Sequence, residues 1–367
     1  MKTSPISDID YMRQALKLTH RGLGKTSPNP MVGAVIVKEG RVIARGYHHG
    51  FGKDHAEVDA LKNAQEDVSG ATLYVTLEPC RHFGKTPPCT DAIIKNKIAK
   101  VVIGMLDPDP KMRGESVKLL NQKGIKTVVG VLEDEARALN ETYIKHRTTG
   151  LPYVTVKFAQ TLDGRIAAAN GSSRWISSPE SLKLAHKLRA THDAILAGIG
   201  NILKDNPELT TRLVKGRNPV RVILDSKLRI PLDAKVLTNQ KAARTLVAAT
   251  PTADKVKLAA LQAMGIEVLT VPPDARGRID LIHLLKTLGE RDISSLLVEG
   301  GGEVITSFLR LGLVDKVVAI IAPKIMGKGI DAVGDLNITD LSKALKLSSL
   351  KTYRSGEDIV VEGRVGS

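Results

Sequence analysis

The chain has only two cysteines, Cys80 and Cys89, among its 367 residues. So few thiols in a chain of this length do not make a disulfide framework, and we expect a protein of the reducing cytoplasm. No apolar run approaches the roughly 18 residues that a membrane-spanning helix requires. Residues 1–12 also lack the basic-then-apolar order of a signal peptide. The sequence therefore predicts a cytoplasmic protein with no membrane partner.

Aromatic residues are scarce as well, at 3% of the chain, although the formal net charge is +15. Grooves for single-stranded nucleic acid combine positive charge with aromatic side chains on which the bases stack. Here the charge is spread evenly, with 23 basic and 17 acidic residues up to Gly150 and 31 and 22 beyond it. We therefore expect an enzyme that handles anionic, phosphorylated small molecules, and no nucleic-acid partner.

The two cysteines belong to a set of residue types that bind metals. His55, Cys80 and Cys89 supply the three protein ligands that a catalytic zinc takes, and such a site leaves its fourth position to water. Glu57 is left over, so its carboxylate can act as a general base. The order His-x-Glu and then Pro-Cys is typical of zinc-dependent nucleobase deaminases. A closed structural site and two unrelated thiols are the alternatives.

The spacing of the cysteines departs from the general deaminase pattern, because eight residues separate them instead of two. Together with Pro28-Asn29-Pro30 and the segment Thr-Leu-Glu-Pro-Cys at 76–80, this insert resembles the deaminase half of the bifunctional deaminase/reductase family of riboflavin biosynthesis. The resemblance covers nearly the whole chain. It implies a cytidine-deaminase-like three-layer α/β/α domain followed by a dihydrofolate-reductase-like α/β domain, and we expect a homo-oligomer, either a dimer or a tetramer.

Alternating strand and helix patterns in both halves predict mainly parallel sheets covered on both faces. The polar stretch 146–152 contains Gly150 and Pro152 and separates the halves, so we expect a deaminase domain at 1–147 and a reductase domain at 151–367. The elements expected first are a helix after Ser7, strands at 32–38 and 41–47, and helices at 55–67 and 133–146. Cys80 is expected at the start of the next element after a strand at 71–77, where a helix N-terminus would favour its thiolate.

The resemblance also implies the residues of each site. The expected substrate residues of the deaminase are Asn29, His48, His82 and Lys85, although a turn residue and an exposed histidine are plainer interpretations of the first two. The expected substrate residues of the reductase are Ser173, Arg189, Leu209, Arg212 and Glu299. The expected cofactor residues are Ala159, Trp175, Asn201, Asp205, Ser226, Gly301 and Gly302.

Two of these reductase segments have chemistry that suits the role. Asp205 offers a proton donor or acceptor, and Arg212 offers a two-pronged contact for the substrate phosphate. The glycines at 300–302 lie between a predicted strand and a predicted helix, where bare backbone can hold a phosphate. They lack the spacing of a Rossmann fingerprint, which is expected for a reductase of the dihydrofolate-reductase type.

The family resemblance implies two successive reactions. The first half would use zinc and Glu57 to hydrolyse the 2-amino group of 2,5-diamino-6-(5-phosphoribosylamino)pyrimidin-4-one. The second half would reduce the ribosyl group to ribityl with hydride from NADPH, with Asp205 as a catalytic residue. Spacing alone supports only a zinc-hydrolytic deaminase fused to a second α/β domain. The alternatives are a nucleic-acid-editing zinc deaminase with a C-terminal binding domain and a non-catalytic zinc module.

Overall fold

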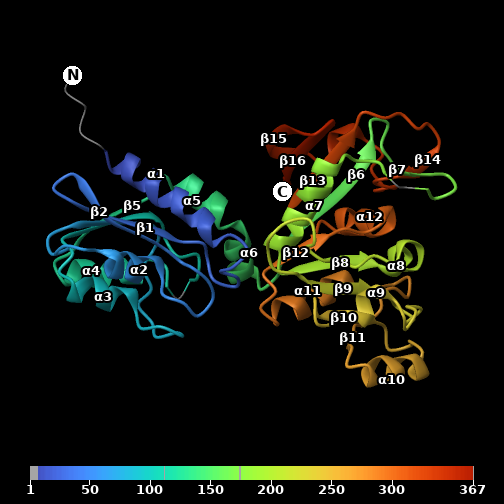
Figure 1. Ribbon diagram of the computed structural model, residues 1–367, viewed down its shortest axis with the longest axis horizontal. Coiled ribbons are helices and arrows are strands. Elements are labelled where there is room, and N and C mark those ends of the chain that lie inside the picture. Colours follow the sequence, from blue (N-terminus) through green and yellow to red (C-terminus); the bar gives the residue numbers. More distant parts are fainter. Residues whose placement is uncertain (1–6, 111, 173–174, 367) are drawn as a thin grey trace. The chain divides into compact units, whose positions relative to one another are not determined.

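The computed structural model describes residues 7–110, 112–172 and 175–366, and the chain divides into two compact units between Gly150 and Leu151 (Figure 1). The elements of the first unit are α1 (Asp8–Thr19), η1 (His20–Gly22), β1 (Gly33–Lys38), β2 (Arg41–Tyr47), α2 (Ala56–Asn63), β3 (Thr72–Leu77), α3 (Cys89–Lys95), β4 (Lys100–Met105), α4 (Glu115–Gln122), β5 (Lys126–Val129), α5 (Glu133–Leu139) and α6 (Glu141–Thr149).

The first unit has three layers around a five-stranded sheet of order β2-β1-β3-β4-β5. Strands β3, β4 and β5 run parallel, whereas β1 is antiparallel to both β2 and β3. Helices α1 and α5 contact each other and share one face, while α2, α3 and α4 follow one another on the opposite face (Figure 1). Strands such as β1 and β4 are apolar and buried along almost their whole length, because both faces of the sheet are covered.

Two elements of the first unit differ from the expected ones. The helix expected at 55–67 ends at Asn63, because the next residue has an extended backbone. The helix expected at 133–146 is two helices, α5 and α6, which meet at Asn140. The side chain of Asn140 accepts a hydrogen bond from the Met31 amide at 2.8 Å and donates one to the Met31 carbonyl at 3.0 Å. Helix α6 then continues to Thr149 and ends at Gly150, whose φ is +72°.

The second unit contains a nine-stranded sheet and a two-stranded one. Its elements are β6 (Tyr153–Thr161), β7 (Arg165–Ala168), α7 (Pro179–Thr191), β8 (Ala194–Gly198), α8 (Ile199–Asp205), β9 (Val220–Leu224), α9 (Lys235–Thr238), β10 (Thr245–Ala249), α10 (Lys255–Ala263), β11 (Glu267–Thr270), α11 (Leu281–Gly289), β12 (Ser295–Val298), α12 (Gly302–Arg310), β13 (Lys316–Ala322), β14 (Gly329–Asp331), η2 (Leu341–Lys343), β15 (Leu347–Ser355) and β16 (Asp358–Val365).

The large sheet has the order β11-β10-β9-β8-β12-β6-β13-β16-β15 and is parallel up to β13. Strand β16 pairs antiparallel with β13 and β15, and β7 pairs with β14 in the small sheet. Alternate residues of β8 belong to different cores: Leu196 packs with α11 and α12, whereas Ile195 packs with α8, α9 and α10. Both faces of the sheet are therefore covered. Within the described residues, no helix combines the length and apolar character needed to cross a membrane.

Candidate active sites

The first site gathers the three predicted zinc ligands. One nitrogen of His55 and the sulfurs of Cys80 and Cys89 all lie within 4.8 Å of one another. The Nδ1 atom of His55 is 3.2 Å from Cys89 Sγ and 3.5 Å from Cys80 Sγ. Tetrahedral zinc, with bonds of about 2.1 Å to nitrogen and 2.3 Å to sulfur, places such atoms roughly 3.6 Å apart. Both the donor set and its spacing therefore fit zinc.

Two helix starts and one strand end position these ligands. His55 precedes the first residue of α2, Cys89 is the first residue of α3, and Cys80 lies in the loop after β3. Cys80 was expected at the start of the element that follows β3, but it lies in a loop, and Cys89 opens α3 instead. The Cys89 amide nevertheless donates a hydrogen bond to Cys80 Sγ at 3.3 Å. Hydrogen bonds from Cys89 and His55 hold the pKa of the Cys80 thiol well below its usual range, which favours the metal-binding thiolate.

Glu57 lies in the first turn of α2, beside the ligand cluster. Its side chain is 3% exposed, and this burial raises its pKa to about 7, against the opposing effect of His55. A carboxyl group with a pKa near neutrality is suited to take up and release protons. The structure thus places a proton-carrying group next to the three ligand residues.

Of the predicted pyrimidine contacts, Asn29 and His48 join this cluster. His48 Nδ1 is 2.9 Å from the Asp54 carbonyl, which can only accept, so Nδ1 carries the proton. His48 Nε2 then accepts from the Asn29 amide nitrogen at 3.2 Å, and the ring centroids of His48 and His55 are 5.3 Å apart. Burial lowers the pKa of His48, consistent with a neutral ring.

The other two predicted contacts lie in the exposed loop that follows Cys80. His82 is exposed, and among the described residues no hydrogen bond or ring contact joins it to the ligand cluster. Lys85 is also exposed, and its ammonium nitrogen lies 3.8 Å from the centroid of the Phe51 ring. Lys85 is therefore placed against the loop 50–53.

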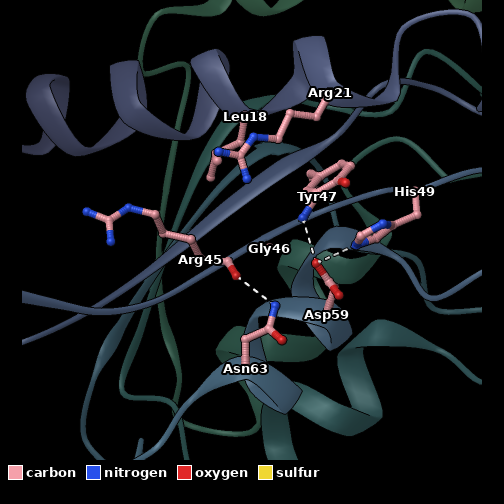
Figure 2. Close-up of a pocket in the computed structure, with 8 residues that line it drawn as sticks. All are labelled: Leu18, Arg21, Arg45, Gly46, Tyr47, His49, Asp59 and Asn63. Carbon is pink, nitrogen blue, oxygen red and sulfur yellow. Dashed lines mark hydrogen bonds and ion pairs between the residues drawn. The ribbon is translucent and has the colours of Figure 1, made fainter.

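Figure 2 shows how α2, which carries Glu57, is fixed to the edge strand β2. On α2, Asp59 accepts a hydrogen bond from the Tyr47 amide at 3.0 Å, and Asn63 donates to the Arg45 carbonyl at 3.0 Å. Between them, a side chain at Gly46 would collide with the α2 backbone. No pattern in the sequence predicts this anchor. The cavity beside it, of about 170 Å³, is lined by Leu18, Arg21, Arg45, Gly46, Tyr47, His49, Asp59 and Asn63.

A second residue that sequence reasoning missed is Glu78, two positions before Cys80. Its buried carboxylate accepts from the amides of Asp107, Gly114 and Ser116 at 2.9–3.1 Å and from the Ser116 hydroxyl at 2.6 Å. It thereby ties the loop after β3 to the loop after β4. The only available signal was its place inside the Thr-Leu-Glu-Pro-Cys segment.

In the second unit, Arg189 of α7 and Glu299, which follows β12, form a buried ion pair. Arg189 donates from Nε and Nη2 to the two carboxylate oxygens at 3.0 and 2.7 Å, and from Nη1 to the Thr210 carbonyl at 3.2 Å. Burial alone would raise the pKa of Glu299, but Arg189 and Lys157 hold it at about 2. The structure thus connects three predicted substrate segments, which lie at positions 189, 209–212 and 299.

Several predicted cofactor residues lie along one edge of the large sheet. Ala159 lies near the end of β6, Asn201 lies in α8 just after β8, Ser226 follows β9, and Gly301 follows β12. These four strands are adjacent and parallel, so their carboxyl ends share an edge, where open α/β sheets bind ligands. Asn201 Oδ1 also accepts from the Gly301 amide at 2.8 Å.

The remaining predicted residues of the reductase are placed as follows. A side chain at Gly302 would come within 2.6 Å of the Asp331 carbonyl, so glycine allows a close approach there. Asp205 ends α8, and Leu209 is buried with φ at +54°. Trp175 is 67% exposed on the loop before α7. Ser173 lies outside the described residues.

Two family models match the chain. The one described as the cytidine and deoxycytidylate deaminase zinc-binding region covers residues 5–105, and the one described as the RibD C-terminal domain covers 152–361. The riboflavin biosynthesis protein RibD of Aquifex aeolicus (strain VF5) is 49% identical over 355 residues, which is 96% of this chain and 97% of that protein.

Solved structures match over the same length. A diaminohydroxyphosphoribosylaminopyrimidine deaminase/5-amino-6-(5-phosphoribosylamino)uracil reductase from Thermotoga maritima is 41% identical, with a TM-score of 0.85, and the match covers 98% of this chain and 99% of that one. RibD from Acinetobacter baumannii is 35% identical, with a TM-score of 0.88 and the same coverage.

These matches favour the bifunctional enzyme over the nucleic-acid-editing alternative, and they extend across both units. The zinc-binding-region match and the reductase match imply zinc and a nicotinamide cofactor. The fold classes predicted for the two halves are confirmed. The chain belongs to the RibD family and is a bifunctional deaminase and reductase of riboflavin biosynthesis.

Proposed function

We propose that the first unit deaminates a diaminopyrimidinone that carries a phosphoribosylamino chain and that the second unit reduces the deaminated product with NADPH. The Thermotoga maritima relative is named for both activities, with the deaminase first, which supports this order of reactions. The observation that carries the proposal is the cluster of His55, Cys80 and Cys89 within 4.8 Å, with the buried Glu57 beside it.

In the deaminase site, His55, Cys80 and Cys89 would hold zinc, which when bound supplies a Lewis acid that lowers the pKa of water to about 7. Glu57 carries two protons in turn: the proton released by the water goes to the ring nitrogen, and the proton on the oxygen that is now bonded to C2 goes to the leaving amine, so that ammonia departs. Asn29 orients the pyrimidine. Its amide nitrogen is occupied by His48, so its amide oxygen remains as an acceptor for a ring N–H.

In the reductase site, the chain's own residues bind and orient the two reactants. Arg212 binds the substrate phosphate, and the glycines at 301–302 lie at the start of α12, where a cofactor phosphate can approach the backbone. NADPH, when bound, would supply the hydride that reduces the ribosyl C1 position. Asp205 supplies the accompanying proton to the ring oxygen of the sugar, so that the C1–O bond breaks and the ring opens to ribityl. Arg189 and Glu299 hold the 209–212 segment against α7.

We also propose a cytoplasmic homo-oligomer, a dimer or a tetramer. The free thiols of Cys80 and Cys89 suit a reducing compartment. The edge strand β15 carries the exposed side chains of Leu350 and Tyr353, which supports self-association. Light scattering of the purified protein measures the subunit number, and a monomer at micromolar concentration would overturn this part.

A two-signal assay tests the proposed reactions. The purified protein receives zinc, the phosphorylated diaminopyrimidinone and NADPH, and ammonia release and NADPH oxidation are followed together. We expect ammonia release to come first, and NADPH oxidation to match it mole for mole. With NADH in place of NADPH, we expect weaker oxidation at equal concentration. NADPH oxidation that begins without ammonia release would contradict the proposed order.

A further inference from the structure

The segment 208–212 has no regular secondary structure, yet side chains hold most of its backbone. Arg221 donates to the Glu208 carbonyl at 3.2 Å, and Arg189 donates to the Thr210 carbonyl at 3.2 Å. The Thr211 amide donates to the side-chain oxygen of Asn218 at 2.6 Å. The fourth contact is made by His186 of α7, whose Nδ1 accepts from the Arg212 amide at 3.1 Å. A loop whose backbone is held at residues 208, 210, 211 and 212 is pre-organised for a ligand.

The geometry fixes the tautomer of His186. A backbone amide can only donate, so Nδ1 must be the unprotonated nitrogen, and the ring proton lies on Nε2. The side chain is 3% exposed, so this acceptor has little access to water. Protonation of Nδ1 would break the bond to Arg212.

The surroundings of His186 keep it neutral. Burial lowers its pKa to about 4, and the positive charges of Arg189 on its own helix, Arg212 on the bound loop and Lys157 on β6 act in the same direction. Glu299, which follows β12, opposes them. The ring is therefore an uncharged acceptor throughout the neutral pH range.

The side chain of Arg212 is exposed, and among the described residues it makes no ion pair, so its guanidinium is available to a ligand anion. We propose that His186 is a positioning residue of the reductase: it fixes the backbone of Arg212 so that the guanidinium meets the substrate phosphate. This inference rests on the proposed function of Arg212. His186 itself touches neither substrate nor cofactor in this role.

The experiment compares His186→Leu, His186→Asn and Arg212→Ala in the full-length protein. Leucine removes the acceptor, whereas the amide oxygen of asparagine can occupy the place of Nδ1. Each variant is assayed for reduction of the deaminated substrate with and without its phosphate, and its ammonia release serves as an internal control from the other unit. NADPH binding by fluorescence titration confirms that the reductase unit has folded.

We expect His186→Leu to raise KM for the phosphorylated substrate about 3- to 10-fold, the loss of one hydrogen bond, with kcat within twofold. KM for the dephosphorylated substrate should not change, and His186→Asn should restore most of the loss. A purely structural role would instead affect both substrates alike. If Arg212→Ala loses phosphate discrimination and His186→Leu keeps it, the inference is wrong. If Arg212→Ala keeps it, the proposed role of Arg212 is wrong, and the inference falls with it.

Discussion

The deaminase unit and the reductase unit place their functional side chains in different ways. In the first unit, the ligand residues and Glu57 come from one stretch of 35 residues, 55–89, at two helix starts and the end of β3. In the second unit, the candidate residues extend from Ala159 to Gly302 and come from β6, α7, α8, α12 and the loops between elements. A metal centre needs few residue types at short range, whereas a pocket along a sheet edge collects one or two residues from each strand.

The same difference appears in what holds each site together. Around the deaminase ligands, backbone amides and helix starts do most of the positioning, as with the Cys89 amide on Cys80. In the reductase, long charged side chains cross between elements, as Arg189 does from α7 to Glu299 and Thr210. We therefore expect substitutions of the ligand residues and of Glu57 to remove most deaminase activity, whereas substitutions of Arg212 and of the residues that hold its segment should raise KM by graded amounts.

The largest expected effect is that of Glu57→Gln, which keeps the shape of the side chain and removes its proton transfer. Ammonia release should fall on the order of 10²–10⁴-fold. Zinc content and NADPH oxidation of the deaminated substrate should stay at wild-type levels. A wild-type deaminase rate in this variant would show that Glu57 has no part in the chemistry.

Arg212→Ala should have the next largest effect, and a graded one. Loss of a charge-assisted contact costs about 1.5–3 kcal/mol, so KM for the phosphorylated substrate should rise roughly 10- to 100-fold. Arg212→Lys should recover part of this, since lysine lacks the two-pronged donor. Asp205→Asn is the matched control on the same segment and should lower kcat with little change in KM. Equal changes in kcat for both arginine variants would argue against a phosphate contact.

The stability of the reductase unit should depend on pH through His186. Its pKa is about 4 in the folded protein, below the value of about 6.5 for an unfolded histidine. Between these values the unfolded chain binds a proton that the folded chain does not, so the free energy of unfolding falls as pH drops from 6.5 to 4. Over this pH range the free energy of unfolding should fall by about 1–3 kcal/mol. Denaturant unfolding at several pH values measures it, and His186→Asn should flatten this dependence.

The smallest effect should come from the anchor between α2 and β2. Asp59→Leu removes the acceptor for the Tyr47 amide at the edge strand and should lower deaminase kcat a few-fold, at a cost of about 1 kcal/mol in stability. Asp59→Asn keeps an acceptor and should stay near wild type, and NADPH oxidation should be unaffected in both. An unchanged deaminase rate in the leucine variant would show that the anchor does not position Glu57.

The elements that could be predicted from the sequence are those whose residue patterns are local. The hairpin at 32–38 and 41–47 and the strand at 71–77 were predicted within one residue, because their apolar and β-branched patterns are local. The break at Asn140 could not be predicted, since it depends on a hydrogen-bonded pair with Met31, 109 residues away.

The candidate sites also contain residues that the sequence predicts and residues that it does not. Residue type and spacing alone predicted the cluster of His55, Cys80 and Cys89 that the structure shows. The roles of these residues and of Glu57 stay predictions. Most of the reductase residues came only from the family resemblance. The roles of Glu78 and His186 depend on which amides happen to face their side chains, and no spacing in the sequence records that.

We propose that one chain holds two separate active centres, of which only the first depends on zinc. The direct test is to remove zinc with a chelator, measure the metal that remains, and follow ammonia release and NADPH oxidation in the same sample. Ammonia release should fall in proportion to zinc and return when zinc is restored, while oxidation of NADPH by the deaminated substrate stays unchanged. Ammonia release that survives nearly complete zinc removal, or NADPH oxidation that falls in parallel with it, would contradict the account.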